Sequence, residues 1–212
     1  MKYRTCMAAL AAGILTLAVV LSFGACGKKD AIEETRQILA AADNFTFIYT
    51  IDGRNSNDMI AFPYQLLVTP DIVSEESSFG TTYALLGADE VTVWEPAGGD
   101  AYVPSKHYTR AEYDAMTLGA DSVYGMFLSY LRRDAWRWDR RRDAFVPRDL
   151  TMFDHLVMEV LDMELAITGT TCTIMGRAIK TENAKQYEVL LTMAVIGIGG
   201  TEITLPDGVG TD

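Results

Sequence analysis

The chain has 212 residues, of which 49% are hydrophobic and 22% are charged. This length and balance fit one globular domain and exclude a wholly disordered, collagen-like or coiled-coil protein. The formal net charge of -11 argues against general nucleic-acid binding. Three cysteines and two histidines argue against a disulfide scaffold or a multi-ligand zinc or iron–sulfur site, so we expect no cofactor.

The N-terminus has the pattern of an export signal. Lys2 and Arg4 precede an uncharged run over residues 5–27, which is a basic region followed by an apolar one. Such a run approaches the ~17–25 residues that span hydrocarbon, so an uncleaved membrane anchor is the alternative. Both interpretations export the rest of the chain.

The end of this run favours cleavage. The segment Leu21-Ser-Phe-Gly-Ala-Cys26-Gly resembles a bacterial lipobox, although Phe23 stands where Leu is usual. The resemblance implies a signal peptide over residues 1–25 and a mature N-terminus at Cys26, acylated with diacylglycerol and fatty acid such as palmitate. The mature chain would then be a lipoprotein on the outer face of the cell membrane, or on the outer membrane of a Gram-negative cell.

A short tether separates this anchor from the domain. Residues 26–29 span roughly 10–15 Å when extended, and Lys28 and Lys29 fall where anionic headgroups would lie. Loss of the two positive charges of Lys2 and Arg4 takes the net charge from -11 to -13. We therefore expect an acidic domain that lies close to its membrane.

The domain opens with a helix and a series of strands. Asp30 begins a segment in which Ile32 and Leu39 share a face and Glu33 is placed as in a capping box, which predicts a helix. Pro63 indicates an edge strand or a bulge in the second of the strands that follow. Alternating or short apolar runs predict these strands at residues 45–51, 60–68, 81–86, 91–95 and 101–103.

The middle of the chain changes to helical spacing. Thr109 and Glu112 form a capping box that predicts a short helix. Asp121 is the predicted cap of a second helix, in which Val123 and Phe127 share a face. Two helices therefore interrupt the sheet.

The rest of the chain predicts a hairpin, one more helix and a final meander. Residues 135–139 and 143–146 are the predicted hairpin arms, and residues 151–161 have helical spacing. Four alternating runs follow, at residues 163–168, 172–179, 187–196 and 202–206. The order of elements predicts an α+β fold, with a single domain over residues 30–206 and a C-terminal tail at residues 207–212.

This order is similar to that of the open-barrel lipoproteins typified by LolA, LolB and LppX. The closest local feature is the ending Tyr187-Glu-Val-Leu-Leu-Thr, a glycine turn, and Ile203-Thr-Leu-Pro. The resemblance implies a strongly curved antiparallel sheet, an open or half barrel, with an N-terminal helix and inserted helices around an apolar cavity. It also implies that the protein carries a lipid or another hydrophobic molecule.

Apolar residues of the long strands and of the second inserted helix are the candidate walls of such a cavity. The helix predicted at residues 109–116 is short and polar, and Gly125 interrupts the packing surface of the next one. Large aromatic side chains can also fill a core outright, so a packed interior is the alternative. The candidate ligand contacts are Phe47, Tyr49, Phe62, Tyr64, Met126, Phe127 and Tyr187.

The sequence shows no catalytic motif. It has no Gly-x-Ser-x-Gly elbow, and Cys172 lies in a predicted strand among apolar neighbours, as a core thiol does. His107 and His155 have no second ligand at metal spacing. The glycines of residues 197–200 lack the following helix that a phosphate loop needs. We expect neither catalytic nor metal-ligating residues.

One basic cluster stands out in the acidic chain. Residues 132–148 hold seven of the twelve arginines, with a local net charge of +4. Alternation puts two tryptophans on one strand face, so aromatic rings and guanidinium groups could meet one interface. A solvated hairpin tip with its tryptophans turned into the core is the alternative. The candidate contacts with an anionic surface are Arg140, Arg141, Arg142, Trp136 and Trp138.

These patterns lead to two hypotheses. The first is a membrane-anchored, extracytoplasmic, non-enzymatic lipoprotein that binds or carries a lipid or other hydrophobic molecule. The alternative is an envelope protein-interaction module with a filled core and no ligand. An enzyme is the third and weakest hypothesis, and the protein partner stays open.

Overall fold

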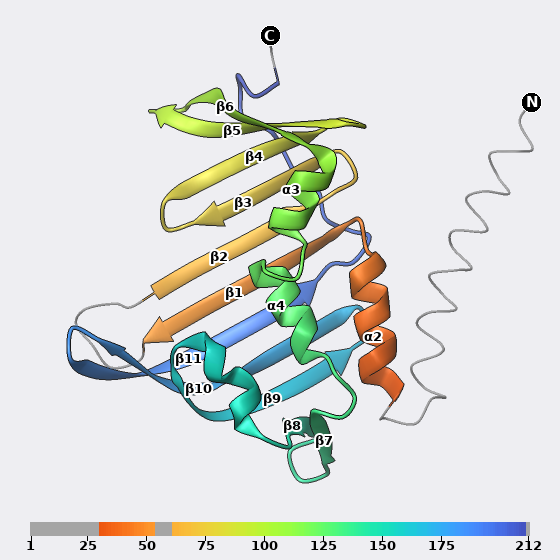
Figure 1. Ribbon diagram of the computed structural model, residues 1–212, viewed down its shortest axis with the longest axis vertical. Coiled ribbons are helices and arrows are strands. Elements are labelled where there is room, and N and C mark those ends of the chain that lie inside the picture. Colours follow the sequence, from red (N-terminus) through yellow and green to blue (C-terminus); the bar gives the residue numbers. More distant parts are fainter. Residues whose placement is uncertain (1–29, 54–60, 211–212) are drawn as a thin grey trace, which may run out of the picture.

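The computed structural model describes residues 30–53 and 61–210. The predictions for the signal peptide, Cys26 and the tether lie outside the described residues. Within them the chain forms an α+β fold built on one open antiparallel sheet of 11 strands, with its helices packed on the sheet (Figure 1).

Two meanders make up the sheet. The first contains β1 (Phe45–Gly53), β2 (Ala61–Val68), β3 (Ile72–Ser77), β4 (Gly80–Leu86), β5 (Glu90–Gly98) and β6 (Ala101–Thr109). The second contains β7 (Trp136–Asp139), β8 (Ala144–Pro147), β9 (Glu159–Thr168), β10 (Thr171–Glu182) and β11 (Lys185–Ile196). The strand order β6-β5-β4-β3-β2-β1-β11-β10-β9-β8-β7 places the first and last strands side by side at the centre.

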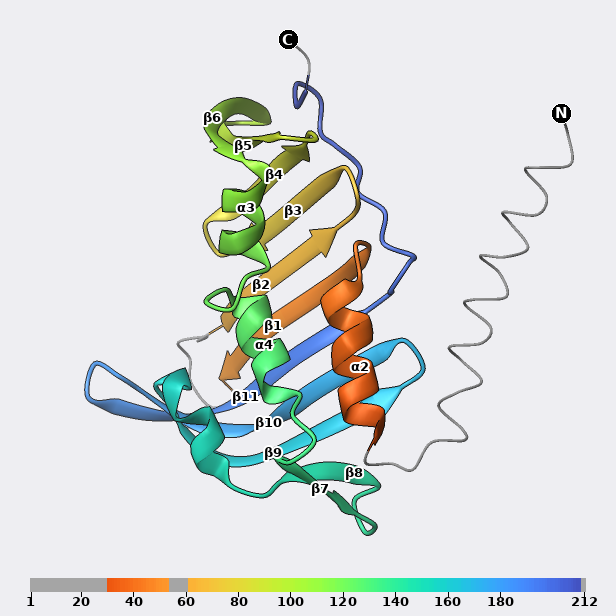
Figure 2. The ribbon, with the colours of Figure 1, turned by 45° about the vertical axis from the view of Figure 1, so that its right-hand side comes forward.

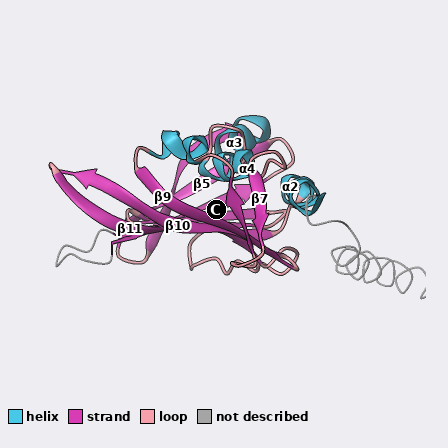
Figure 3. Cartoon of the chain, turned by 90° about the horizontal axis from the view of Figure 1, so that it is seen from below, coloured by secondary structure: helices cyan, strands magenta, loops and turns pink. Residues whose placement is uncertain are grey.

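The helices precede, join and interrupt these meanders. They are α2 (Asp30–Ala41), α3 (Arg110–Thr117), α4 (Val123–Tyr130) and the 3-10 helix η1 (Leu150–Leu156). Figure 2 shows α2, α3 and α4 in front of the sheet, and the end-on view shows α3 and α4 above one face of the strands (Figure 3). The predicted N-terminal helix and the two helices between the meanders are confirmed.

The central pairing joins strands from the two ends of the domain. Thr46 lies opposite Ile196 and Gly53 opposite Val189, in an unbroken antiparallel register. On the other side of β1, Pro63 of β2 pairs with Thr50 without a bulge. The pairing of β2 with β3 begins one residue later, so this proline sits where its strand has a neighbour on one side, which suits a residue without an N–H group.

The core lies between the central strands and the helices. Burial alternates along β1, with Phe45, Phe47 and Tyr49 buried and the residues between them half-buried. The Phe45 ring stacks on Tyr124 of α4 at 4.6 Å between centroids, and the Phe47 ring lies 5.3 Å from Phe127. Aromatic side chains therefore carry much of the packing between α4 and the sheet.

The caps of the inserted helices confirm one prediction and correct another. Thr109 and Glu112 form the predicted capping box. The second helix is capped by Ser122 rather than Asp121, because the Ser122 hydroxyl accepts a hydrogen bond from the Gly125 amide at 2.9 Å. Gly125 is no gap in the packing: a Cβ there would stand 2.0 Å from the Gly119 carbonyl oxygen, so glycine is required for this close approach.

The helix predicted at residues 151–161 is confirmed only in its first half. Residues Leu150–Leu156 form a 3-10 helix, capped by Asp149, and β9 begins at Glu159. Val157 ends the helix in the left-handed region at φ 56°, and Val160 then pairs with Ala178 of β10. Residues from Glu159 onward thus form a strand paired with β10, although the spacing of their apolar side chains is typical of a helix.

The sequence analysis also missed β3 and predicted a strand that does not form. The β3 sequence Ile-Val-Ser-Glu-Glu-Ser is mostly polar, yet the strand pairs on both sides. Residues 202–206 form no strand. Instead, the segment after Thr201 leaves the central strands, and Gly210 comes to lie against Leu85 of β4.

Replacement of Val157 by glycine should stabilise the domain by about 1 kcal/mol. A left-handed conformation is costly for a β-branched residue, and the side chain is 90% exposed, so little packing is lost. Denaturant unfolding of Val157→Gly measures the effect. Val103→Gly in the extended strand β6 is the control and should destabilise; the same loss in both variants would contradict the strain argument.

Candidate anion-binding cleft

The predicted basic hairpin is confirmed. Strands β7 and β8 pair Trp136 with Pro147 through Asp139 with Ala144. The turn between them carries Arg140, Arg141 and Arg142, whose side chains are all exposed. Asp139 helps to shape this turn, because its carboxylate accepts a hydrogen bond from the Arg141 amide at 2.8 Å.

The two tryptophans turn toward the core. Trp136 is buried, its indole N–H donates to the Tyr130 carbonyl oxygen at 2.7 Å, and its ring meets the edge of Phe153. Trp138 is half-buried, with its ring edge-on to Phe145 at 4.9 Å. The structure thus places the arginines of this hairpin outside and the tryptophan rings inside, as the solvated-tip interpretation predicts.

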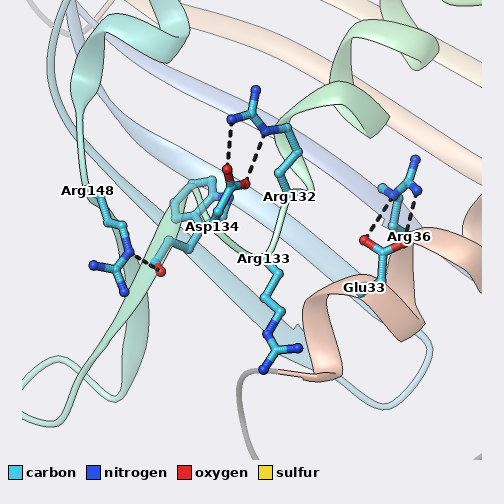
Figure 4. Close-up of a pocket in the computed structure, with 7 residues that line it drawn as sticks. Glu33, Arg36, Arg132, Arg133, Asp134 and Arg148 are labelled. Carbon is cyan, nitrogen blue, oxygen red and sulfur yellow. Dashed lines mark hydrogen bonds and ion pairs between the residues drawn. The ribbon is translucent and has the colours of Figure 1, made fainter.

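A cleft of about 580 Å³ opens between this hairpin and helix α2 (Figure 4). It lies where the connection after α4, the start of β7 and the first turns of α2 come together. We call this hollow the arginine cleft. Its positive side chains are Arg36, Arg132, Arg133 and Arg148, and its other lining residues are Glu33, Asp134 and Trp136. Four guanidinium groups against two carboxylates leave the lining with an excess of positive charge.

Each carboxylate in the cleft lies beside an arginine. Arg132 donates two hydrogen bonds to Asp134, at 3.3 and 3.2 Å, and Arg36 donates to Glu33 at 2.9 Å (Figure 4). These guanidinium groups hold the pKa values of both carboxyls below their usual range. The carboxylates therefore stay charged at neutral pH, while the exposure of the pairs makes them weak and replaceable.

Backbone contacts fix the position of Arg148. Its Nε donates to the Trp136 carbonyl oxygen at 3.1 Å, and its amide donates to the Ala135 carbonyl oxygen at 2.8 Å. Because Trp136 is itself held by the core, this guanidinium is preorganised at the wall of the cleft. Such planar donors suit the oxygens of phosphate or carboxylate.

One ion pair joins the cleft to the beginning of the domain. Arg133 lies 3.0 Å from Asp30, the first residue of α2. The sequence analysis identified the arginines of residues 132–148 but missed Arg36, Glu33 and Asp30, which lie about a hundred residues away along the chain. The helical spacing of α2 places Glu33 and Arg36 one turn apart, yet nothing local indicates that they meet the hairpin.

The predicted ligand contacts of the core pack against one another. Phe47 and Phe127 are fully buried and Tyr49 is buried, whereas the other four residues of the set are half-buried. The Phe47 ring meets the edge of Tyr64 at 6.3 Å, and Tyr49 meets Phe62 at 5.8 Å. The half-buried members are Phe62, Tyr64, Met126 and Tyr187, all packed against the core.

The remaining candidates occupy ordinary structural positions. The two histidines are far apart: His107 lies on β6 within 3.3 Å of the Thr92 hydroxyl, and His155 lies 2.8 Å from the Tyr130 hydroxyl. Cys172 is buried in β10. Over residues 30–53 and 61–210, no three His, Cys, Asp or Glu side chains are grouped so that they could hold a metal ion.

No protein-family model matches the chain. No curated protein matches it either. In the part of the chain that the structure describes, no helix is both long and apolar enough to cross a membrane.

Burial should make Cys172 both unreactive and a source of pH-dependent stability. Desolvation raises the pKa of its thiol to about 12, against roughly 8.5 for an unfolded cysteine. Above that lower value the unfolded chain loses the proton while the folded domain keeps it, so the unfolding free energy falls by about 1.4 kcal/mol per pH unit until the folded pKa is reached.

The unfolding free energy is measured against pH for the unaltered protein and for Cys172→Ala. The difference between the two isolates the contribution of the thiol, because the tyrosines titrate in both proteins. In a chain that begins at Gly27, Cys172 is the one remaining cysteine. A thiol reagent should modify it only as fast as the domain opens. Rapid modification of the folded domain, or equal pH slopes in the two proteins, would show that the thiol is accessible.

Proposed function

We propose that this chain is an exported, membrane-anchored lipoprotein without enzymatic activity, whose arginine cleft and hairpin tip dock the domain on an anionic membrane surface. The open sheet would act as a scaffold, curved toward a half barrel, for this basic end. The proposal combines the export pattern and Cys26 from the sequence with the cleft from the structure.

The observation that carries this proposal is the Arg133–Asp30 ion pair of 3.0 Å. Asp30 follows Cys26 by four residues, a length of chain that spans about 14 Å at most. A lipid on Cys26 would therefore keep the start of α2, and with it the arginine cleft, close to the headgroups. Lys28 and Lys29 of the tether would add to the same positive surface.

The charge distribution supports an orientation in which the arginine cleft faces the membrane. The chain is strongly acidic, with a net charge of -11, so an anionic membrane should repel most of its surface. The exposed arginines of the hairpin and cleft gather at the end of the sheet where α2 begins (Figures 1 and 2). The domain would therefore meet the membrane with one end only.

The aromatic packing favours the filled-core alternative over a carrier cavity. Phe47 contacts both Tyr124 and Phe127 of α4, in the place where a carried molecule would have to lie. Gly125 adds a close backbone contact rather than empty space. We therefore propose that any ligand binds at the basic end and not between α4 and the sheet.

Substitution of Cys26 by alanine should release the protein from membranes or stall its processing, because the acyl chains and the tether lysines together provide stable attachment. Fractionation of cells, with mass measurement of the protein, tests this. If Cys26→Ala keeps an unchanged membrane fraction with the N-terminal segment still attached, the chain is held by an uncleaved apolar anchor instead.

Neutralisation of the hairpin tip should weaken binding to anionic vesicles. The triple variant Arg140→Gln, Arg141→Gln, Arg142→Gln should lose about tenfold or more in affinity, since each cation near such a surface contributes roughly 1 kcal/mol. Arg142 should contribute least, because it already lies 3.0 Å from Glu164. Cosedimentation at several salt concentrations measures the loss.

A second triple variant tests whether the loss of vesicle binding depends on the place of the removed charges or only on the net charge of the protein. Lys106→Gln, Arg110→Gln, Lys180→Gln removes the same number of charges from β6, α3 and the end of β10, none of which lines the hairpin or the arginine cleft. This control should bind nearly as well as the unaltered protein. Equal losses in the two triple variants would reduce the hairpin to a solvated tip.

A further inference from the structure

A second pocket adjoins the arginine cleft and differs from it in character. It has a volume of about 310 Å³ and shares Arg133, Trp136 and Arg148 with the cleft. Its other walls are Arg137 and Arg140 of the hairpin, Ile32 of α2 and the paired rings of Trp138 and Phe145. The two hollows therefore form one groove that is lined by arginines throughout and gains apolar side chains in its second part.

The charged end is built for an anion with several oxygens. Arg148 is held by the Trp136 carbonyl, whereas Arg132 and Arg133 are in exposed pairs with Asp134 and Asp30. The Arg148 guanidinium therefore loses little freedom when it donates to a phosphate, and the other two can exchange their carboxylate partners for it. A volume of about 580 Å³ is within the range of small-molecule sites and leaves room for a headgroup.

The apolar part of the groove has a floor of core side chains. Ile32, Trp136 and Phe145 are almost fully buried, and the half-buried ring of Trp138 lies edge-on to Phe145. Arginine side chains over such a floor offer their methylene groups to an apolar ligand and their heads to water or to phosphate. A purely ionic ligand would leave the apolar side chains of this groove uncovered.

From these two halves we infer that the groove binds a single anionic phospholipid, with its phosphate among Arg132, Arg133 and Arg148 and its glyceryl and first acyl carbons over Ile32, Trp138 and Phe145. This inference rests on the proposed membrane docking, which supplies the lipid, and it replaces a diffuse charged contact with one defined molecule.

Asp134 acts as the internal competitor of the phosphate. Its carboxylate accepts two hydrogen bonds from Arg132, in an exposed pair that a phosphate can displace. Removal of this carboxylate should therefore tighten binding at the groove. The Arg110–Asp114 pair of α3, at 2.9 Å, is the same kind of pair far from the site and provides matched controls.

The test uses residues 26–212, the chain expected after signal cleavage, produced without acylation. Calorimetric titration compares soluble dihexanoyl phosphatidylglycerol, glycerol 3-phosphate and inorganic phosphate. We expect one lipid per protein, bound at least about tenfold more tightly than either small phosphate, because only the lipid covers the apolar floor. Equal affinity for inorganic phosphate would overturn the inference and leave a site for a small anion.

Variants locate the site. Asp134→Asn should bind the lipid roughly two- to fivefold more tightly, whereas Asp114→Asn, with the same charge change, should not. Arg132→Gln and Arg148→Gln should each lose about tenfold, and Arg110→Gln should lose little. Circular dichroism confirms folding. Because the Arg132 guanidinium pairs with an exposed carboxylate, its variant remains informative if Arg148→Gln unfolds.

The outcomes separate this inference from the proposed function. If soluble lipid does not bind, or if the paired variants lose affinity equally, the groove is no defined lipid site. Anionic vesicles could still bind through the hairpin tip in that case, and membrane docking would stand. If neither soluble lipid nor vesicles bind, both proposals fail.

Discussion

The pairing of β1 with β11 is the contact on which the rest of the structure depends. It joins the first strand of the domain to the last across an unbroken register from Thr46–Ile196 to Gly53–Val189. Without it the two meanders would be separate sheets, each with one additional exposed edge, at β1 and at β11. Because α2 directly precedes β1, this pairing also brings the beginning of the domain to β9 and α4, and so brings Asp30 to Arg133.

Tyr130 connects the core to the basic end. Its ring packs on Phe153, its hydroxyl meets His155, and its carbonyl oxygen accepts the indole N–H of Trp136. The carbonyl of Trp136 in turn accepts from Arg148. A chain of contacts thus runs from buried aromatic rings to a surface guanidinium, which explains how a short hairpin at the edge of a sheet can hold charged side chains in place.

The sequence predicted correctly those elements that depend on contacts between neighbouring residues, and it failed where pairing with a distant strand decides the structure. The period-2 pattern of Phe45, Phe47 and Tyr49 and the capping box of Thr109 are properties of neighbouring residues, and both are confirmed. The polar strand β3 forms because two strands flank it, not because of its own composition. In the same way, residues from Glu159 onward join β10 although their spacing is typical of a helix.

The sequence by itself determined the acidic balance, the export pattern, the α+β order of elements and the arginine-rich hairpin, because each is read from composition or from neighbours along the chain. Only the tertiary structure decided which way Trp136 turns, that the rings of Phe47 and Phe127 fill the space under α4, and that Glu33 and Arg36 join the arginine cleft. The physical reason is that the packing of α4 on β1 and the approach of α2 to the hairpin join residues about 80 to 100 positions apart. No local pattern encodes which of the possible long-range partners a side chain meets.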